Sequence, residues 1–349
     1  MNRSRWVLVL VLLAVIAGIW LMRRRAAHDP PAYIADRSVT LWSSAAQVRR
    51  PLATLAYGEK VMVLRHSGDQ VEVQAEDGAQ GWVDTRLLMD SALWQRAAEL
   101  LAHAREMPAQ ALGHTRTISN VHIHPGREAP RIFQFGRNVP VVVLERRVMD
   151  VTPSGAAEGP REAESVTPGE KKPDGGDWLL VLRADTEKPE SAAASRPSTQ
   201  PKVTKDAEPA IPVAGWVLSR FVELDPPPPI GDYTSSVGGR VVAWALLNTG
   251  PDANGNKPQY LVAGIRGGEG QSCDFTWIRV FTWGAQRRRY ETAYVESQLC
   301  GHLPIRVRQT RAGPEFRFPD QTNAERTYQM TQTIVRRVGR LEGSRRKAK

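Results

Sequence analysis

Two cysteines, and a histidine beside one of them, are the residues best suited to covalent chemistry. Cys273 and Cys300 are the only cysteines among 349 residues, and His302 follows Cys300 closely. A papain-like peptidase needs a cysteine thiolate, usually at the start of a helix, with a histidine near it in space. The residues after Cys273 alternate with a period of two, which indicates a strand. We therefore predict no catalytic residue and a protein that is not an enzyme.

The two cysteines also fit a structural role. Cys273 precedes a predicted hairpin and Cys300 follows it, so a bond between them would close the open end of that hairpin. In an oxidising compartment such a pair forms a disulfide, typically worth about 2–4 kcal/mol. Two buried free thiols are the alternative. We predict the disulfide.

Candidate metal and phosphate sites are weak. His122 and His124 are two apart on a predicted strand, and His114 is a conceivable third ligand, but no carboxylate or cysteine completes a zinc site. The glycine-rich stretch 266–270 lacks the Gly-Lys-Ser/Thr ending of a phosphate-binding loop. We predict ordinary strand histidines, a plain loop, and neither metal nor cofactor.

The net charge of +10 is concentrated at the two ends of the chain. Residues 1–25 hold five arginines and no acidic residue, residues 336–349 are also strongly basic, and the chain between them is close to neutral. This distribution argues against a nucleic-acid groove. It favours contact with anionic surfaces, for which the candidates are Arg287, Arg288 and Arg289 in a predicted hairpin loop and Arg345, Arg346 and Lys347 in the tail.

The first 25 residues predict a membrane anchor. An uncharged apolar run from Trp6 to Met22 is flanked by arginines and is long enough for a short membrane-spanning helix. Arg23 to Arg25 separate this run from any small-residue cleavage site, which favours an uncleaved signal-anchor over a cleaved signal. With an even cysteine count, this predicts a single pass through the inner (cytoplasmic) membrane, with the body exported to the periplasm.

Beyond the anchor, the sequence predicts mainly β structure. Alternating β-branched and aromatic segments dominate, and many of the prolines gather in short tracts that predict linkers or loop insertions. Only Ser91 to Met107 has a convincing helical pattern, with Ser91 as a candidate cap and Pro108 after its end.

An internal repeat is the most informative pattern. Val39-Thr40-Leu41-Trp42 corresponds to Asn120-Val121-His122-Ile123, and both copies then run through an alternating strand pair. Each copy closes on Gly-Trp-Val-x-x-Arg, beginning at Gly81 in the first and at Gly215 in the second. We therefore predict two small β units, at 33–90 and 113–225, joined by a linker helix at 91–112.

This pattern resembles the bacterial SH3 (SH3b) domain family, whose scheme includes a Gly-x-x-Val-x-Val strand and a terminal Gly-Trp-Val. The resemblance implies two SH3-like β-barrels, the second with Pro-rich insertions at 150–176 and 184–214. The closing residues are expected in the barrel cores: Gly81, Trp82, Val83, Gly215, Trp216 and Val217. The first copy lacks the family's Arg and Gly-Pro turn after Leu41, although the turn and its neighbours would line a ligand groove.

The resemblance also implies a function. Trp42 and Tyr57 are the candidate ligand-binding residues. The expected partners are cell-wall peptide or envelope proteins, bound without catalysis by a membrane-anchored envelope protein. Two alternatives stay open: a scaffold subunit of a membrane complex, and a cell-wall hydrolase with an unrecognised C-terminal catalytic domain.

The last predicted unit is an antiparallel β domain at 230–338, followed by a basic tail at 339–349. Strands are predicted at 241–247, 260–265, 274–283, 290–295 and 305–308. We expect Phe275, Trp277, Phe281 and Trp283 on one face of a strand, as core. Residues 327–338 fit either a final strand or a frayed helix.

Overall fold

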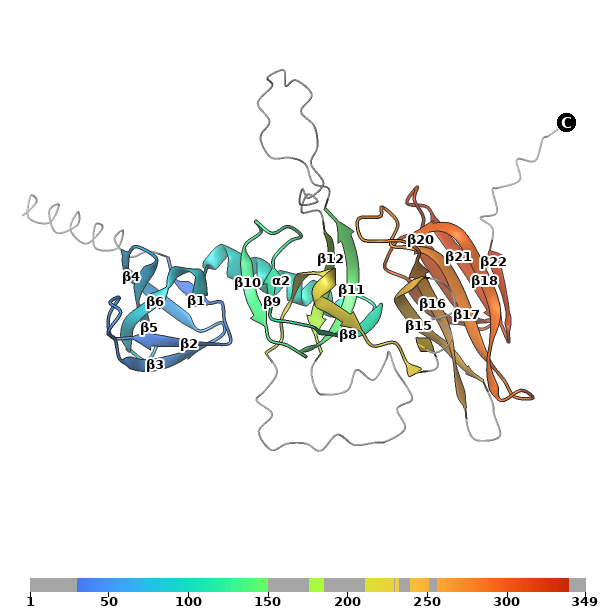
Figure 1. Ribbon diagram of the computed structural model, residues 1–349, viewed down its shortest axis with the longest axis horizontal. Coiled ribbons are helices and arrows are strands. Elements are labelled where there is room, and N and C mark those ends of the chain that lie inside the picture. The colour runs from blue at the N-terminus through green and yellow to red at the C-terminus, as the bar shows by residue number, and fades with distance from the viewer. Residues whose placement is uncertain are drawn as a thin grey trace, which may run out of the picture. The chain divides into compact units, whose positions relative to one another are not determined.

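The structure, a computed structural model, describes residues 30–149, 176–184, 211–228, 230–231, 239–250 and 256–338. Their architecture is mainly β, in several antiparallel sheets (Figure 1). The predicted span Trp6–Met22, nearly all of both Pro-rich insertions and the basic tail lie outside these residues. Within them, no helix has the length and apolar character needed to cross a bilayer.

The first sheet has seven strands in the order β3-β2-β6-β5-β4-β1-β7. Its strands are β1 (Ala32–Ile34), β2 (Ser38–Trp42), β3 (Pro51–Ala56), β4 (Lys60–Ser67), β5 (Gln70–Ala75), β6 (Gln80–Asp84) and β7 (Leu88–Asp90). A short 3-10 turn, Thr85–Leu87, joins β6 to β7. Alternate residues of these strands, among them Leu41, Val63, Val73 and Val83, form one apolar core on the inner face.

The second sheet repeats this order with the equivalent strands: β10-β9-β13-β12-β11-β8-β14. Its strands are β8 (Ala111–Thr115), β9 (Ser119–His122), β10 (Arg131–Phe135), β11 (Pro140–Val148), β12 (Asp177–Arg183), β13 (Ala214–Leu218) and β14 (Val222–Leu224). A 3-10 turn, Ser219–Phe221, again follows the strand that carries Gly-Trp-Val. Even the irregularities recur, since the register shifts between Val63 and Arg65 in β4 and between Val143 and Glu145 in β11.

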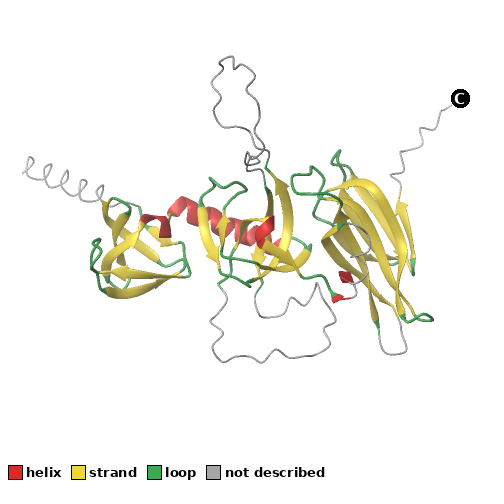
Figure 2. Ribbon diagram, in the orientation of Figure 1, coloured by secondary structure: helices red, strands yellow, loops and turns green. Residues whose placement is uncertain are grey.

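Helix α2 (Ser91–Glu106) lies between the two sheets in sequence and is the long helix in Figure 2. Its cap differs from the prediction: the Asp90 carboxylate accepts a hydrogen bond from the Leu93 amide at 2.6 Å, while the Ser91 hydroxyl donates to the Pro31 carbonyl. The helix ends before Pro108, which cannot continue it.

Two four-stranded sheets follow. One has the order β15-β16-β17-β18 and the other β19-β20-β21-β22. Their strands are β15 (Arg240–Gly250), β16 (Lys257–Ile265), β17 (Phe275–Gly284), β18 (Arg289–Gly301), β19 (Arg306–Thr310), β20 (Gly313–Pro319), β21 (Glu325–Thr331) and β22 (Ile334–Val338). Residues from both sheets, including Leu261, Phe316 and Tyr328, form one shared core.

Two predictions for this region were wrong. Phe275 packs in the shared core with Ile278 and Val280, so it does not share a face with Trp277. The cause is a register shift between Phe275 and Trp277, which breaks the alternation of β17. Residues 327–338 are neither one strand nor a helix, because a turn with Gln332 at φ 55° divides them between β21 and β22.

The described chain forms two compact units. Among the described residues, one unit contains 30–99 together with 130–134, and the other contains 100–129 and those from Phe135 onward. The C-terminal sheets therefore belong to the same unit as most of the second seven-stranded sheet. Their junction is part of one compact body.

Candidate functional site

A row of side chains crosses five strands on the outer face of the first sheet. Register places Arg65 opposite Glu72, Glu72 opposite Trp82, Trp82 opposite Trp42, and Trp42 beside Pro51. Residues opposite one another on neighbouring strands share a face. We call these five residues the outer row.

Gly81 permits the close approach of β2 and β6 beneath this row. A Cβ atom at this position would lie 2.6 Å from the Trp42 carbonyl oxygen and 2.7 Å from Leu41 Cγ. Only glycine fits there without displacing β2. The Gly-Trp-Val phrase thus allows the strand contact that sets Trp42 against Trp82.

Two arginines cover the tryptophans of the outer row. The Arg65 guanidinium lies 5.1 Å from the centroid of the Trp82 ring and pairs with Glu72 at 2.6 Å. The Arg49 guanidinium lies 4.4 Å from the Trp42 ring and has an exposed side chain. Trp82 is buried, but Trp42 is only partly buried. Trp42 and Arg49 thus present an aromatic and cationic surface to solvent.

The equivalent row of the second sheet is Glu145, Leu180, Trp216 and His122. Trp216 and Leu180 belong to an apolar cluster with Leu144 and Trp178, and that cluster also contains Ala104 of helix α2. Leu100, Leu101 and Met107 pack against it. The C-terminal half of α2 therefore covers this face of the second sheet.

Matched positions differ in polarity between the outer faces of the two sheets, and within the described residues the α2 cover is seen only on the second. Three polar residues of the first sheet occupy positions that are apolar in the second. Gln70 is equivalent to Trp178, Glu72 to Leu180 and Asp84 to Leu218. The carboxylates of Glu72 and Asp84 favour solvent, whereas their apolar counterparts favour burial. The predicted core residues Gly81, Trp82, Val83, Gly215, Trp216 and Val217 are all buried. Trp82 and Trp216 nevertheless lie on the outer faces, opposite to Val83 and Val217.

Tyr57, the second predicted ligand-binding residue, packs inside its own unit. Its ring makes edge contacts with Trp94 at 5.6 Å and with Phe133 at 5.0 Å. This burial raises the pKa of Tyr57 to about 12. The structure does not bring Tyr57 into the outer row.

The histidines have local partners. His122 Nδ1 lies 2.7 Å from the Ala129 carbonyl oxygen, and the ring meets Trp178 edge-on. His124 lies after β9 instead of within it, so the two do not alternate along one strand. His114 Nδ1 lies 3.0 Å from the Asp225 carboxylate. Among the described residues, no group of three or more histidines, cysteines or acidic residues is arranged to hold a metal ion.

The predicted anionic-surface arginines divide between described and undescribed residues. Arg287 and Arg289 both pair with Glu291, at 3.1 and 3.8 Å, and border a shallow hollow of about 430 Å³. Arg288 sits between them at φ 48°, at the turn between β17 and β18. Arg345, Arg346 and Lys347 lie outside the described residues. The carboxylate of Glu291 thus offsets part of the charge of this loop.

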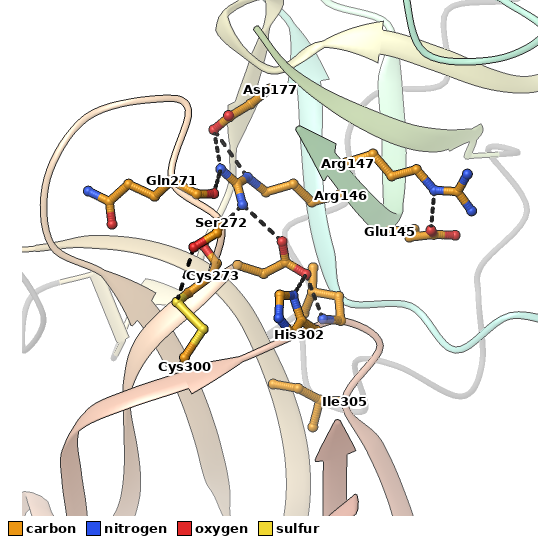
Figure 3. Close-up of polar contacts among 12 residues, drawn as sticks. Glu145, Arg146, Arg147, Asp177, Gln271, Ser272, Cys273, Cys300, His302 and Ile305 are labelled. Carbon is orange, nitrogen blue, oxygen red and sulfur yellow. Dashed lines mark hydrogen bonds and ion pairs between the residues drawn. A yellow bond between two sulfur atoms is a disulfide. The ribbon is translucent and has the colours of Figure 1, made fainter. Parts of the chain in front are cut away.

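The most buried charges lie at the junction between the second sheet and the C-terminal sheets (Figure 3). The side chain of Arg146, in β11, is 3% exposed and pairs with Asp177 at 2.8 Å and with Asp274 at 2.9 Å. It also donates to the carbonyls of Gln271 and Cys273, each at 3.1 Å. Buried charges need partners of this kind, because an unpaired one is costly.

The acceptors for Arg146 come largely from residues 266–274, which we call the docking loop. This loop links β16 to β17 and contains the glycine-rich stretch. Gly267 and Gly270 have φ of 103° and 84°, values that favour glycine. The Gly270 amide donates to Asp177 at 2.9 Å, and Glu269 accepts from the Ser219 hydroxyl at 2.9 Å. The glycine-rich stretch therefore docks onto the second sheet.

A second contact holds the same junction. Gln110, which is 2% exposed, accepts at its side-chain oxygen from the Ile305 amide at 2.7 Å and donates to the Ile305 carbonyl at 3.1 Å. Its own carbonyl accepts from the Trp244 amide at 2.9 Å. Two sets of contacts therefore hold the junction. We call those made by Arg146 the Arg146 arm and those made by Gln110 the Gln110 arm.

Cys273 and Cys300 form a disulfide at the base of the docking loop. The Cys273 sulfur is therefore not a free thiolate. His302 faces Asp274, with Nδ1 3.6 Å from the carboxylate. A hydrogen bond with Asp274 raises the pKa of His302. The cysteines and the histidine thus belong to the structural junction.

Sequence reasoning missed the junction. Arg146, Asp177, Asp274 and Gln110 are single polar residues within or beside apolar strands, and their partners are distant in sequence. One signal was available: Arg146 interrupts the alternation of β11, because the bulge at Leu144 turns it inward.

Comparisons with known proteins add little. No known family matches the sequence, and no curated protein matches it. A solved crystal structure of an NlpC/P60 family protein from Bacillus cereus ATCC 10987 is similar at 11% identity, over 76% of this chain and 94% of that chain, with a TM-score of 0.21. Nothing about activity follows from a likeness of this size.

Proposed function

We propose that this protein is a non-catalytic binding component of the bacterial cell envelope. Its N-terminal segment anchors it in the inner membrane, and its body lies in the periplasm. Two SH3b-like units follow the anchor. The first binds a partner, either cell-wall peptide or another envelope protein, and the second serves as a structural support for the C-terminal sheets.

The observation that carries this proposal is the difference between two matched faces. Helix α2 covers the outer face of the second sheet with Leu100, Leu101 and Ala104. Among the described residues of the first sheet, Arg65 and Pro51 of the outer row are exposed, and Trp42 is partly exposed beneath the Arg49 guanidinium. Tryptophan and arginine are enriched among residues that dominate binding energy. The first sheet is therefore the better candidate for binding.

The SH3b-like assignment is supported by the strand order. Both sheets have the same order of seven strands, and in each the strand that carries Gly-Trp-Val is followed by a 3-10 turn and a last short strand. Export is supported by the Cys273–Cys300 disulfide, since such bonds persist in oxidising compartments. The non-catalytic role is supported by the same bond, because it occupies the sulfur that a papain-like mechanism would need as a thiolate.

Retention on purified peptidoglycan sacculi tests the proposal. Full-length protein in mild detergent is compared with Trp42→Ala and Arg49→Ala, and with Arg96→Ala, which removes another exposed arginine from the same unit. We expect retention of the unaltered protein and of Arg96→Ala, and about tenfold less of the other two, the effect of losing roughly 1.4 kcal/mol of binding free energy.

Other outcomes separate the alternatives. If Trp42→Ala is retained as well as the unaltered protein, and retention of both disappears at high salt, charge attraction alone accounts for it and the proposed site is wrong. Absence of retention, with Trp42-dependent crosslinking to a membrane protein in cells, would select an envelope protein as partner. Neither retention nor Trp42-dependent crosslinking would refute the proposal.

A further inference from the structure

The docking loop supplies most of the groups that accept hydrogen bonds from Arg146. Of the four groups that accept from its guanidinium, Asp177 belongs to the second sheet, and the other three are Gln271, Cys273 and Asp274 of the loop. The C-terminal sheets can therefore hold Arg146 only while the docking loop is kept in this position.

The disulfide restrains one end of that loop. Cys273 is a loop residue whose carbonyl accepts from Arg146, and its sulfur is bonded to Cys300 in β18. The other end holds Gly267 and Gly270, which have wide backbone freedom. Cleaving the disulfide would restore conformational freedom to the loop, and ordering the loop would then carry an entropic cost.

Undocking would leave no orphaned charge on the second sheet. Arg146 would keep its ion pair with Asp177, and water would replace the loop carbonyls as acceptors. Asp274 is adjacent to His302, which could retain the contact already present. Both docked and undocked arrangements are thus chemically reasonable, which a switch requires.

We propose that the Cys273–Cys300 disulfide is a redox switch for the docking of the C-terminal sheets onto the second sheet. With the bond formed, the docking loop holds Arg146 and the junction is rigid. A dithiol reductant converts the disulfide to two cysteine thiols and is itself oxidised to a disulfide. The loop then releases Arg146, and the Gln110 arm opens with it. A rigid junction would thus form only where the disulfide can form.

Hydrogen exchange at individual amides tests this proposal. The Trp244 and Ile305 amides donate to Gln110, and the Gly270 amide donates to Asp177, so all three report docking. The Asp274 amide donates to Gly301 and reports only the base of the hairpin. The Ala35 amide, which donates to Leu87 in the first sheet, serves as the control.

The full chain in detergent is measured oxidised, after reduction by dithiothreitol, and as Cys273→Ala/Cys300→Ala. We expect exchange at Trp244, Ile305 and Gly270 to rise at least tenfold on reduction and in the variant, with Ala35 unchanged. Faster exchange confined to Asp274 and its immediate neighbours would overturn the proposal, because the disulfide would then only close the hairpin. Reduction of the folded protein keeps the test valid if the variant does not fold.

A cycle with Arg146 tests the coupling itself. Arg146→Met should accelerate exchange at Trp244 on its own, and reduction of this variant should then add less than a further twofold. Effects that multiply independently would overturn the proposal, since the disulfide and the arginine would not act through the same junction.

Discussion

Trp42 and His122 occupy the same position in two sheets of identical strand order: each lies opposite the tryptophan of a Gly-Trp-Val phrase, Trp82 and Trp216 respectively. Trp42 is partly exposed under Arg49, whereas His122 is buried against Trp178. In the sequence repeat, Trp42 corresponds to Ile123, which is one residue after His122. The repeat therefore conserves the strand order and changes what covers its outer face.

Leu64 and Leu144 are a matched pair that measures this difference. Both sit at the bulge of their strands, but Leu144 is 0% exposed beneath α2 and Leu64 is 38% exposed. We expect Leu144→Ala to lower the free energy of unfolding by about 2–5 kcal/mol, through the cavity it leaves, and Leu64→Ala by less than about 1 kcal/mol. Chemical denaturation monitored for each unit provides the measurement. Equal losses would contradict the assignment of the covered face.

Tyr57 should matter for high-pH stability and not for binding. Its folded pKa of about 12 exceeds the ordinary value near 10, so the unfolded chain loses this proton first as pH rises. The contribution of Tyr57 to the free energy of unfolding is therefore complete below about pH 10 and falls between about pH 10 and 12. The stability of Tyr57→Phe relative to the unaltered protein should therefore increase over that range. Loss of sacculus retention in this variant would instead place Tyr57 at the binding surface.

The strand positions of the two sheets follow from local patterns that the sequence displays. Period-two alternation marks β4, β5, β11 and β12, and the helix predicted over 91–107 is α2 at Ser91–Glu106. The disulfide followed from the even cysteine count and the flanked hairpin. These features depend on residues near one another in sequence.

The rest depends on contacts between distant residues. Strand alternation decides on which face of the sheet Trp82 lies, and a neighbouring element decides whether that face is covered. The Gly-Trp-Val phrase does not predict that α2 covers the outer face in the second sheet. The docking loop reads as a plain glycine-rich loop because Arg146 lies more than a hundred residues away. Strand β20 was missed because Gly313, Pro314 and Pro319 suggest a turn, although its Phe316 and Phe318 lie in the shared core.

Arg146 and Arg147 are neighbours with opposite environments. Arg146→Ala would leave Asp177, which is 0% exposed, without its main partner, whereas Arg147 pairs at the surface with Glu145. We expect Arg146→Ala to lower the free energy of unfolding of this unit by about 3–5 kcal/mol and Arg147→Ala by less than about 1 kcal/mol. Arg146→Met with Asp177→Asn should recover part of the loss, because it removes one of the two carboxylates that lose Arg146, the other being Asp274. A small effect of Arg146→Ala would mean that water solvates the junction.

His302 should make the stability of the junction depend on pH. It faces Asp274, with Arg146 and Asp320 also acting on it, and the hydrogen bond with Asp274 raises its pKa in the folded protein. Because the pKa of His302 is higher in the folded protein than in the unfolded chain, protonated His302 stabilises the fold. Its contribution to the free energy of unfolding is complete below the unfolded pKa near 6.5 and is lost as pH rises through the folded pKa. A third of the side chain is exposed, so solvent screening should limit the effect to less than about 1 kcal/mol. His302→Gln should therefore be less stable than the unaltered protein at pH 5.5 and indistinguishable at pH 9, while His103→Gln, on an exposed position of α2, should show no such trend. A His302→Gln difference that stayed constant over this range would assign His302 a packing role without a titrating contact.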